Sequence, residues 1–208
     1  MKALLSYLLF GFLFIPLVSA QEEDNPTSGM NKFLSKNLKY PSEARANDVQ
    51  GTVIIQTKFN DLGFPLNSTV ISGDQLLAEE VKCTVSALSE NWKPEFLGER
   101  LKGGSYLMSF QFRISRDETG SKPIQQMIPL EEHEMLMRNP QKRFDSKLEA
   151  NPYDYKLYEQ RAKLYESLGF EVLAKKDQLL ADYFKNRMLT EIVVVGYVVK
   201  SKGRSSID

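Results

Sequence analysis

One ten-residue stretch constrains the fold of this chain more than any other. Residues 105–114 alternate between two sets of side chains, and a period of two predicts a β-strand with one buried face. The first set is apolar: Tyr106, Met108, Phe110, Phe112 and Ile114. The second set is mainly polar: Ser105, Leu107, Ser109, Gln111 and Arg113. Gly103-Gly104 precedes the strand and a polar run follows it, so its limits are well marked.

The residues before this strand predict the rest of a small folded unit. Residues 30–37 have the spacing of a short amphipathic helix, and residues 51–59 and 66–72 alternate as two strands of a hairpin. Residues 76–91 predict a helix that Asp74 caps, with an apolar stripe. The stripe is Leu77, Val81, Val85 and Leu88. The order helix, strand, strand, helix, strand predicts an α+β unit with a three-stranded antiparallel sheet and a helix packed on one face.

The second half of the chain is predicted to be helical. A linker at 115–126 leads into a helical region, 127–187, in which residues 151–184 form an α-helical hairpin joined at Leu168-Gly169. Small residues allow its helices to pack closely: Ala162, Ala174 and Ala181. The hairpin resembles one tetratricopeptide repeat, which must cover its apolar face on another surface. Residues 188–208 form a β-prone tail and predict a C-terminal β-strand.

The composition argues against several classes of function. Lysine plus arginine equals aspartate plus glutamate, 27 of each, which gives no electrostatic reason to expect nucleic acid as a partner. Cys83 is the only cysteine, and His133, the only histidine, lies among glutamates that predict a solvated acidic helix face. No catalytic triad, phosphate loop or metal cluster is evident. We therefore expect a protein that is not an enzyme, with no cofactor, no metal and no small-molecule substrate.

The first twenty residues predict export. Met1–Ala20 has a positive start, an apolar run and small residues before Gln21, as in a signal peptide cleaved after Ala20. A retained membrane anchor is the alternative, and membrane association is expected only through this segment. Residues 21–29 predict a linker. We expect the chain in a bacterial periplasm or, if anchored, on the inner membrane and facing the periplasm.

Between residues 31 and 114 the chain carries an ordered series of residues at characteristic spacings. The series is Leu38-x-Tyr40-Pro41, Ala44, Gly51-x-Val53, Phe59, Gly63, Val70, Gly73, Leu76-Leu77, Glu80, Leu88, Trp92-Lys93-Pro94, Tyr106 and Phe110-x-Phe112. This series resembles a known family, the C-terminal domain of TonB proteins, which are energy transducers of the periplasm. Each residue has a structural explanation, such as a core position for Trp92, a helix stop for Pro94 and turn geometry for Gly51 and Gly63. Together they indicate a fold, spanning residues 30–114, and not a catalytic site.

The resemblance implies how this domain acts. In the family, the domain takes a short segment of an outer-membrane receptor, the TonB box, as an added strand on the edge of its last strand. The corresponding edge here is Ser105, Tyr106, Leu107, Met108, Ser109, Phe110, Gln111, Phe112 and Arg113. TonB-dependent receptors are thus the expected partners. The family's membrane-helix histidine and its long proline-rich spacer are absent from 1–29, so coupling to a proton-driven motor is not implied.

The tail resembles the other half of the same interaction. Its sequence is similar to the TonB-box region of large outer-membrane receptors of the Bacteroidetes type. The box-like residues are Glu191, Ile192, Val193, Val194, Val195, Gly196 and Tyr197. We expect this tail on the edge of residues 105–114, in its own chain or in a neighbour's, where a parallel pairing would use the helices as the crossover. It could also be bait for another TonB protein, or simply a structural closing strand.

Two classes of function follow. The first is a periplasmic interaction module that binds receptor segments by strand addition. The second is a scaffold or adaptor of tetratricopeptide type, in which the small domain is a dock and the tail is an internal plug.

Overall fold

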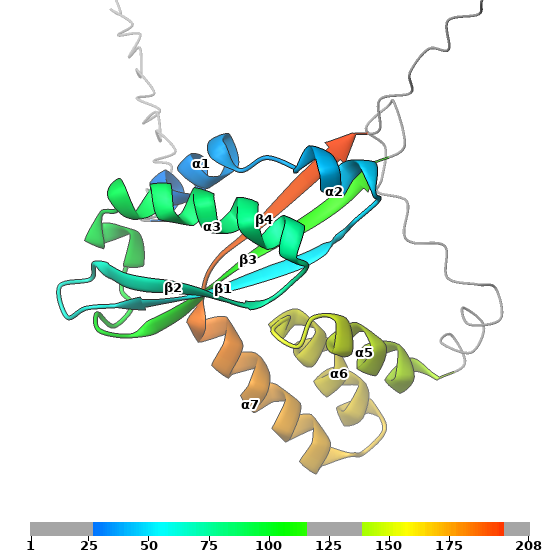
Figure 1. Ribbon diagram of the computed structural model, residues 1–208. Helices are drawn as coiled ribbons and strands as arrows, with labels where there is room; N and C mark the ends of the chain where they lie inside the picture. Colours follow the sequence, from blue (N-terminus) through cyan, green and yellow to red (C-terminus); the bar gives the residue numbers. More distant parts are fainter. Residues whose placement is uncertain (1–26, 116–138, 198–208) are drawn as a thin grey trace, which may run out of the picture.

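The computed structural model describes residues 27–115 and 139–197. The predicted signal peptide, the linker between the two halves, the segment around His133 and the residues after Tyr197 lie outside them. The elements, in order, are α1 (Ser28–Asn37), α2 (Ser42–Ala46), β1 (Gly51–Phe59), β2 (Pro65–Ser72), α3 (Gln75–Glu90), the short 3-10 helix η1 (Pro94–Leu97), β3 (Ser105–Ser115), α5 (Pro140–Ala150), α6 (Tyr155–Ser167), α7 (Glu171–Arg187) and β4 (Met188–Tyr197) (Figure 1).

The sheet has four strands in the order β2-β1-β3-β4. β1 is antiparallel to both β2 and β3, whereas β4 is parallel to β3. The predicted three-stranded antiparallel sheet was therefore wrong, although the α+β class fits. The physical reason is that α5, α6 and α7 provide the long crossover that a parallel neighbour requires, so the C-terminal strand joins the same sheet.

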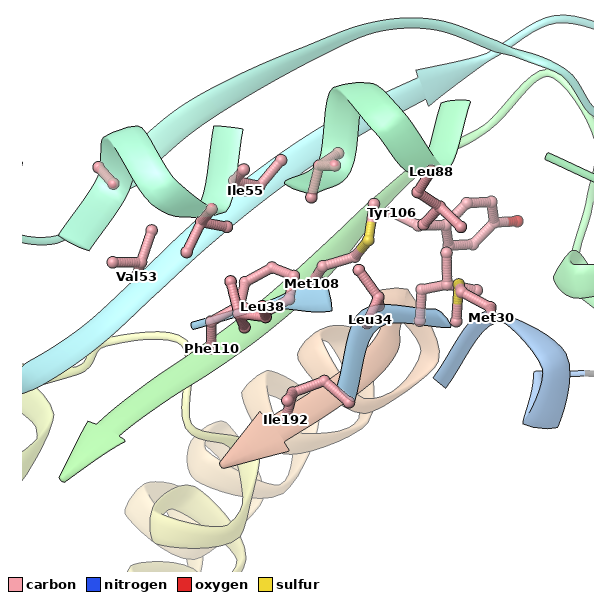
Figure 2. Packing of buried hydrophobic residues seen from close by; sticks show 14 of the residues in the cluster. Met30, Leu34, Leu38, Val53, Ile55, Leu88, Tyr106, Met108, Phe110 and Ile192 are labelled. Carbon is pink, nitrogen blue, oxygen red and sulfur yellow. The ribbon is translucent and has the colours of Figure 1, made fainter. Parts of the chain in front are cut away.

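One face of the sheet carries the main core. α3 crosses this face, and the whole predicted stripe, Leu77, Val81, Val85 and Leu88, is buried. The helix begins at Gln75, one residue before the predicted start, and Asp74 caps it as predicted: its Oδ1 accepts a hydrogen bond from the N–H of Leu76 at 2.9 Å. α1 adds Met30 and Leu34 to the same cluster, beside side chains of β3 and β4 (Figure 2).

The opposite face is covered at one end by the helical hairpin. Leu107 of β3 packs with Ile54 of β1 and Met188 of β4, and Phe184 of α7 lies against them. Leu107 is therefore only 4 % exposed, although it lies on the side of the strand that was expected to be open. The alternation of 105–114 placed the core face correctly, but it gave no sign that helices would cover part of the other face.

The hairpin has its own polar centre. The guanidinium of Arg161 on α6 donates to the carboxylate of Asp177 on α7, at 2.7 and 2.9 Å, and also to Asp145 on α5. Asp177 is buried, so the ion pair replaces the water that its carboxylate loses. The predicted small residues Ala162, Ala174 and Ala181 are all buried between the helices.

Candidate functional site: the edge of the sheet at β3 and β4

The structure brings the two sequence-predicted halves of the site together. β4 pairs with β3 from Leu107 to Ser115, and all the box-like residues, Glu191 to Tyr197, lie in that ladder. Ser109 lies opposite Glu191, and Arg113 lies opposite Val195. The expected pairing of the tail with this edge is observed over Glu191–Tyr197, where it is parallel and lies within one chain. Among the predicted edge residues, only Ser105 and Tyr106 precede the ladder.

The pairing decides which backbone groups of β4 remain available. The N–H of Ile114 in β3 donates to Oε1 of Gln50, just before β1, at 2.8 Å. The carbonyl of Gly104 likewise accepts from the N–H of Phe59 in β1, at 2.9 Å. The even-numbered residues of β3 thus direct their backbone N–H and C=O groups to β1, and the odd-numbered residues of β3 direct theirs to β4.

In a parallel pair of strands, the N–H and C=O of one residue bond to the two residues that flank the residue directly opposite it. Gln111 lies opposite Val193, so its backbone groups face Ile192 and Val194. It follows that the N–H and C=O groups of Val193 and Val195 point away from β3.

The side chains of β4 divide between the two faces. Ile192 lies in the main core, whereas Val193, Val195 and Tyr197 are 56, 43 and 55 % exposed. Gly196 lies directly against the ring of Tyr40, where an added Cβ would be 2.8 Å from a ring carbon. The glycine thus permits a close approach that a larger residue would obstruct.

Tyr40, a residue of the family-like series, is held by three contacts. Its hydroxyl donates to the carbonyl of Val49 at 2.6 Å, and its ring meets Phe112 edge-on with centroids 5.3 Å apart. Burial, and then the nearby Asp48 carboxylate, raise the pKa of Tyr40, so the hydroxyl stays protonated and remains a donor. The third contact is the one with Gly196, which the sequence did not predict.

Several polar contacts fix the start of β4. Arg100 donates to the carbonyl of Met188 at 3.0 Å, and the hydroxyl of Thr190 donates to Asn31 of α1 at 2.6 Å. The ammonium of Lys156 on α6 binds Glu191 at 2.7 Å. This hydrogen bond is the largest cause of the raised pKa of Lys156. Sequence analysis missed these contacts, because they join residues far apart in the chain and have no local pattern.

Tyr155 completes the polar group around Glu191. Its hydroxyl donates to the Glu191 carboxylate at 3.3 Å. Burial raises the pKa of Tyr155, and the charge of Glu191 raises it further. An open pocket of about 400 Å³ lies here, lined by Thr27, Asn31, Arg100, Tyr155, Lys185, Met188, Leu189, Thr190 and Glu191. The beginning of β4 is therefore both anchored and bordered by cationic side chains.

The other family-like residues form the frame of the sheet. Trp92 is buried, and its indole N–H donates to the carbonyl of Gly63 at 2.8 Å. Gly63 has a φ of 86°, a value that favours glycine. Pro41 and Lys93 lie just before α2 and η1, at their N-cap positions, while Pro94 begins η1 and Gly51 begins β1. These positions explain the residues structurally.

No family model, curated protein or solved structure matches the chain. The TonB resemblance therefore remains a prediction that depends on the residues quoted above. In the part of the chain that the structure describes, no cluster of three His, Cys, Asp or Glu residues could hold a metal ion. No helix within 27–115 or 139–197 is long and apolar enough to cross a membrane.

Proposed function

We propose that this protein is a non-enzymatic interaction module of the TonB C-terminal type. It acts in the periplasm and binds extended, box-like segments of TonB-dependent outer-membrane receptors by adding them to its sheet. The observation that supports this most is the ladder of β3 and β4, in which a valine-rich, box-like segment already lies as an added parallel strand at the sheet edge.

Strand addition suits this sheet for a general physical reason. An edge strand presents N–H and C=O groups at a regular spacing, and an incoming extended segment satisfies them while its alternate side chains contact the flanking surface. Here the rigid support is supplied by α1 and α3, which pack on the core face behind the edge. The affinity would come mainly from the backbone, so the partner is defined by conformation and side-chain pattern.

Direct titration tests the proposal. A fluorescent peptide that contains an acidic residue followed by a β-branched run is added to the protein beginning at Gln21, and anisotropy is recorded. The control peptide has proline at alternate positions, which removes backbone donors while leaving most of the apolar character. We expect saturable binding of the first peptide only. Equal binding of both, or of neither, would contradict strand addition.

A second candidate function, the adaptor, is favoured by an exposed apolar stripe on α7. Val172, Leu179 and Tyr183 are 83, 62 and 51 % exposed and fall on one side of the helix. In this case the hairpin binds a protein partner, the small domain is a dock, and β4 is an internal plug.

Site-specific crosslinking in cells tests the adaptor. A photo-crosslinking residue at Leu179 should trap one defined protein, identified by mass spectrometry. The same probe at Gln178, which is exposed but lies about a third of a turn of α7 away from the stripe, is the matched control. Identical products from both positions would argue against a binding role for the stripe.

A further inference from the structure

We infer that the receiving edge of this protein is the outer side of β4 and not β3, and that it takes an extended segment that is apolar in the middle and acidic at the end beside Met188. This inference rests on the proposed function and specifies where the partner strand binds. It departs from the expectation that the partner would bind directly to residues 105–113.

The outer side of β4 has unused hydrogen-bonding groups. The backbone N–H and C=O of Val193 and Val195 point away from β3, as the register requires. Within 27–115 and 139–197, no other residue donates to or accepts from these groups. A strand placed here would satisfy them without breaking any existing pair.

Among the described residues, β2 and β4 form the two outer edges of the sheet, and these edges differ in regularity. β2 has two register irregularities against β1, between Ile54 and Ile55 and between Lys58 and Phe59, and its middle residues are polar. Bulges and polar residues protect an edge against pairing. β4 has one irregularity, at its very beginning, and runs in regular register from Thr190 to Tyr197. The edge at β4 is therefore the better acceptor of a regular strand.

Displacement of β4 from β3 would be the costly alternative. Leu189 and Ile192 are buried in the main core, and Met188 is buried on the other face. β4 follows α7 directly, with no intervening loop, so its start cannot leave without disturbing the hairpin. An incoming segment would also compete with a tethered strand at an effective concentration of about millimolar. Addition to the outer side avoids all of these costs.

The surroundings of β4 define the chemistry of the partner. Val193, Val195 and Tyr197 are exposed on one face and offer apolar contacts to alternate side chains of the added strand. At the Met188 end, the pocket contains Arg100 and Lys185. Lys185 pairs with Glu159, but Arg100 forms no ion pair within the described residues. An acidic residue of the partner would be attracted to that end, so a segment whose acidic residue is at its N-terminal end would lie parallel to β4.

A disulfide lock separates addition from displacement. Gln111 and Val193 are direct partners in the ladder, so the double variant Gln111→Cys/Val193→Cys can join β3 to β4. Cys83 is exposed and is replaced by Ser to prevent other disulfides. The probe is a labelled peptide with the sequence of residues 190–199, followed by two lysines for solubility. Because it copies β4, it can also compete for the β3 edge.

Peptide affinity is compared between the oxidised, locked protein and the same protein after reduction. We expect the two dissociation constants to agree within about twofold. A loss of binding on oxidation that reduction restores would overturn the inference but leave strand addition in place. No binding in either state would overturn both the inference and the proposed function for this class of peptide.

A proline on β4 tests the outer side directly. Val195→Pro removes an N–H that faces away from β3, so the existing ladder keeps its bonds. Val195→Thr, which keeps the N–H and the β-branched shape, is the matched control. We expect the proline variant to bind the peptide about tenfold more weakly, the equivalent of one good interaction, while the threonine variant binds normally.

Circular dichroism and thermal melting must first show that both Val195 variants are folded. Equal affinity of the two folded variants would overturn the inference. If the proline variant does not fold, Val193→Pro, compared with Val193→Thr, repeats the test at the other outward-facing position.

Discussion

The two faces of the sheet are covered by hydrophobic clusters of very different size. On the face under α1 and α3, twenty buried residues form one continuous cluster. On the face under the hairpin, the cluster has three buried residues, Ile54, Leu107 and Met188, with partly buried and mainly aromatic residues around them. β4 contributes to both clusters. The comparison indicates that the first face makes the domain stable, while the second attaches the hairpin and holds the start of the last strand.

The largest effect is expected from Phe110→Ala, at the centre of the first face. Phe110 is completely buried in β3. Removing its ring should lower the free energy of unfolding by about 3–5 kcal/mol, through lost burial and a residual cavity. Urea denaturation followed by circular dichroism measures this change. An effect below about 1 kcal/mol would mean that the face can repack freely, contrary to a dense core.

Met188→Ala applies the same kind of change to the second face and should cost less. Met188 is 7 % exposed, and its cluster is small. We expect a loss of about 2 kcal/mol, near the lower limit for a buried methionine, because the few neighbours can relax into the space. Hydrogen exchange should show the loss first in α7 and β4. An equal loss of protection in α3 would show that the two faces unfold as one unit.

The unequal faces also explain how much of the fold was predictable. The core face could be predicted from local sequence patterns. Val53, Ile55 and Phe59 alternate in one strand, and apolar residues from Leu77 to Leu88 recur at helical spacing. Asp74 as the helix cap was likewise a local signal. The burial of Leu107 had no such local signal, because it depends on Met188 and Phe184, which are far away in the chain.

The candidate site was predictable in part for the same reason. The β-prone residues 190–197 and the alternating residues 105–114 each have a strong local pattern, so their pairing could be proposed. The predicted three-stranded sheet was still wrong, because a uniformly β-prone run does not show whether it pairs within its own chain or with a neighbour's. Arg100, Asn31 and Lys156, which fix the start of β4, are ordinary surface residue types with no detectable pattern.

Gly196→Ala tests the packing at the point where β4 meets the first face. The added Cβ would approach the ring of Tyr40 to 2.8 Å, and that ring is held by Val49 and Phe112. We expect a destabilisation of about 1–2 kcal/mol, as for other overpacked sites. The double variant Gly196→Ala/Tyr40→Ala removes the obstacle and is the control. If the two effects simply add, the contact between β4 and Tyr40 is not important for stability.

The smallest expected effects come from two matching helix caps, one for each face. Asp74 accepts from the N–H of Leu76 at the start of α3, and Asp154 accepts from the N–H of Lys156 at the start of α6, at 2.9 and 3.0 Å. Either change to Ala should cost about 1 kcal/mol, whereas Asn, which also caps, should cost little. Because the bonds are so similar, any difference must come from the coupling of each helix to the rest of the protein.

Native-state hydrogen exchange can detect that difference. Asp74→Ala should lower the protection of the slowest amides in β1 and β3, since α3 belongs to the main core. Asp154→Ala should lower protection in α6 and α7 and leave those slowest amides unchanged, because the hairpin is attached through a small cluster. If Asp154→Ala also accelerates exchange in β1, then the hairpin stabilises the whole sheet, and the division between the two faces is wrong.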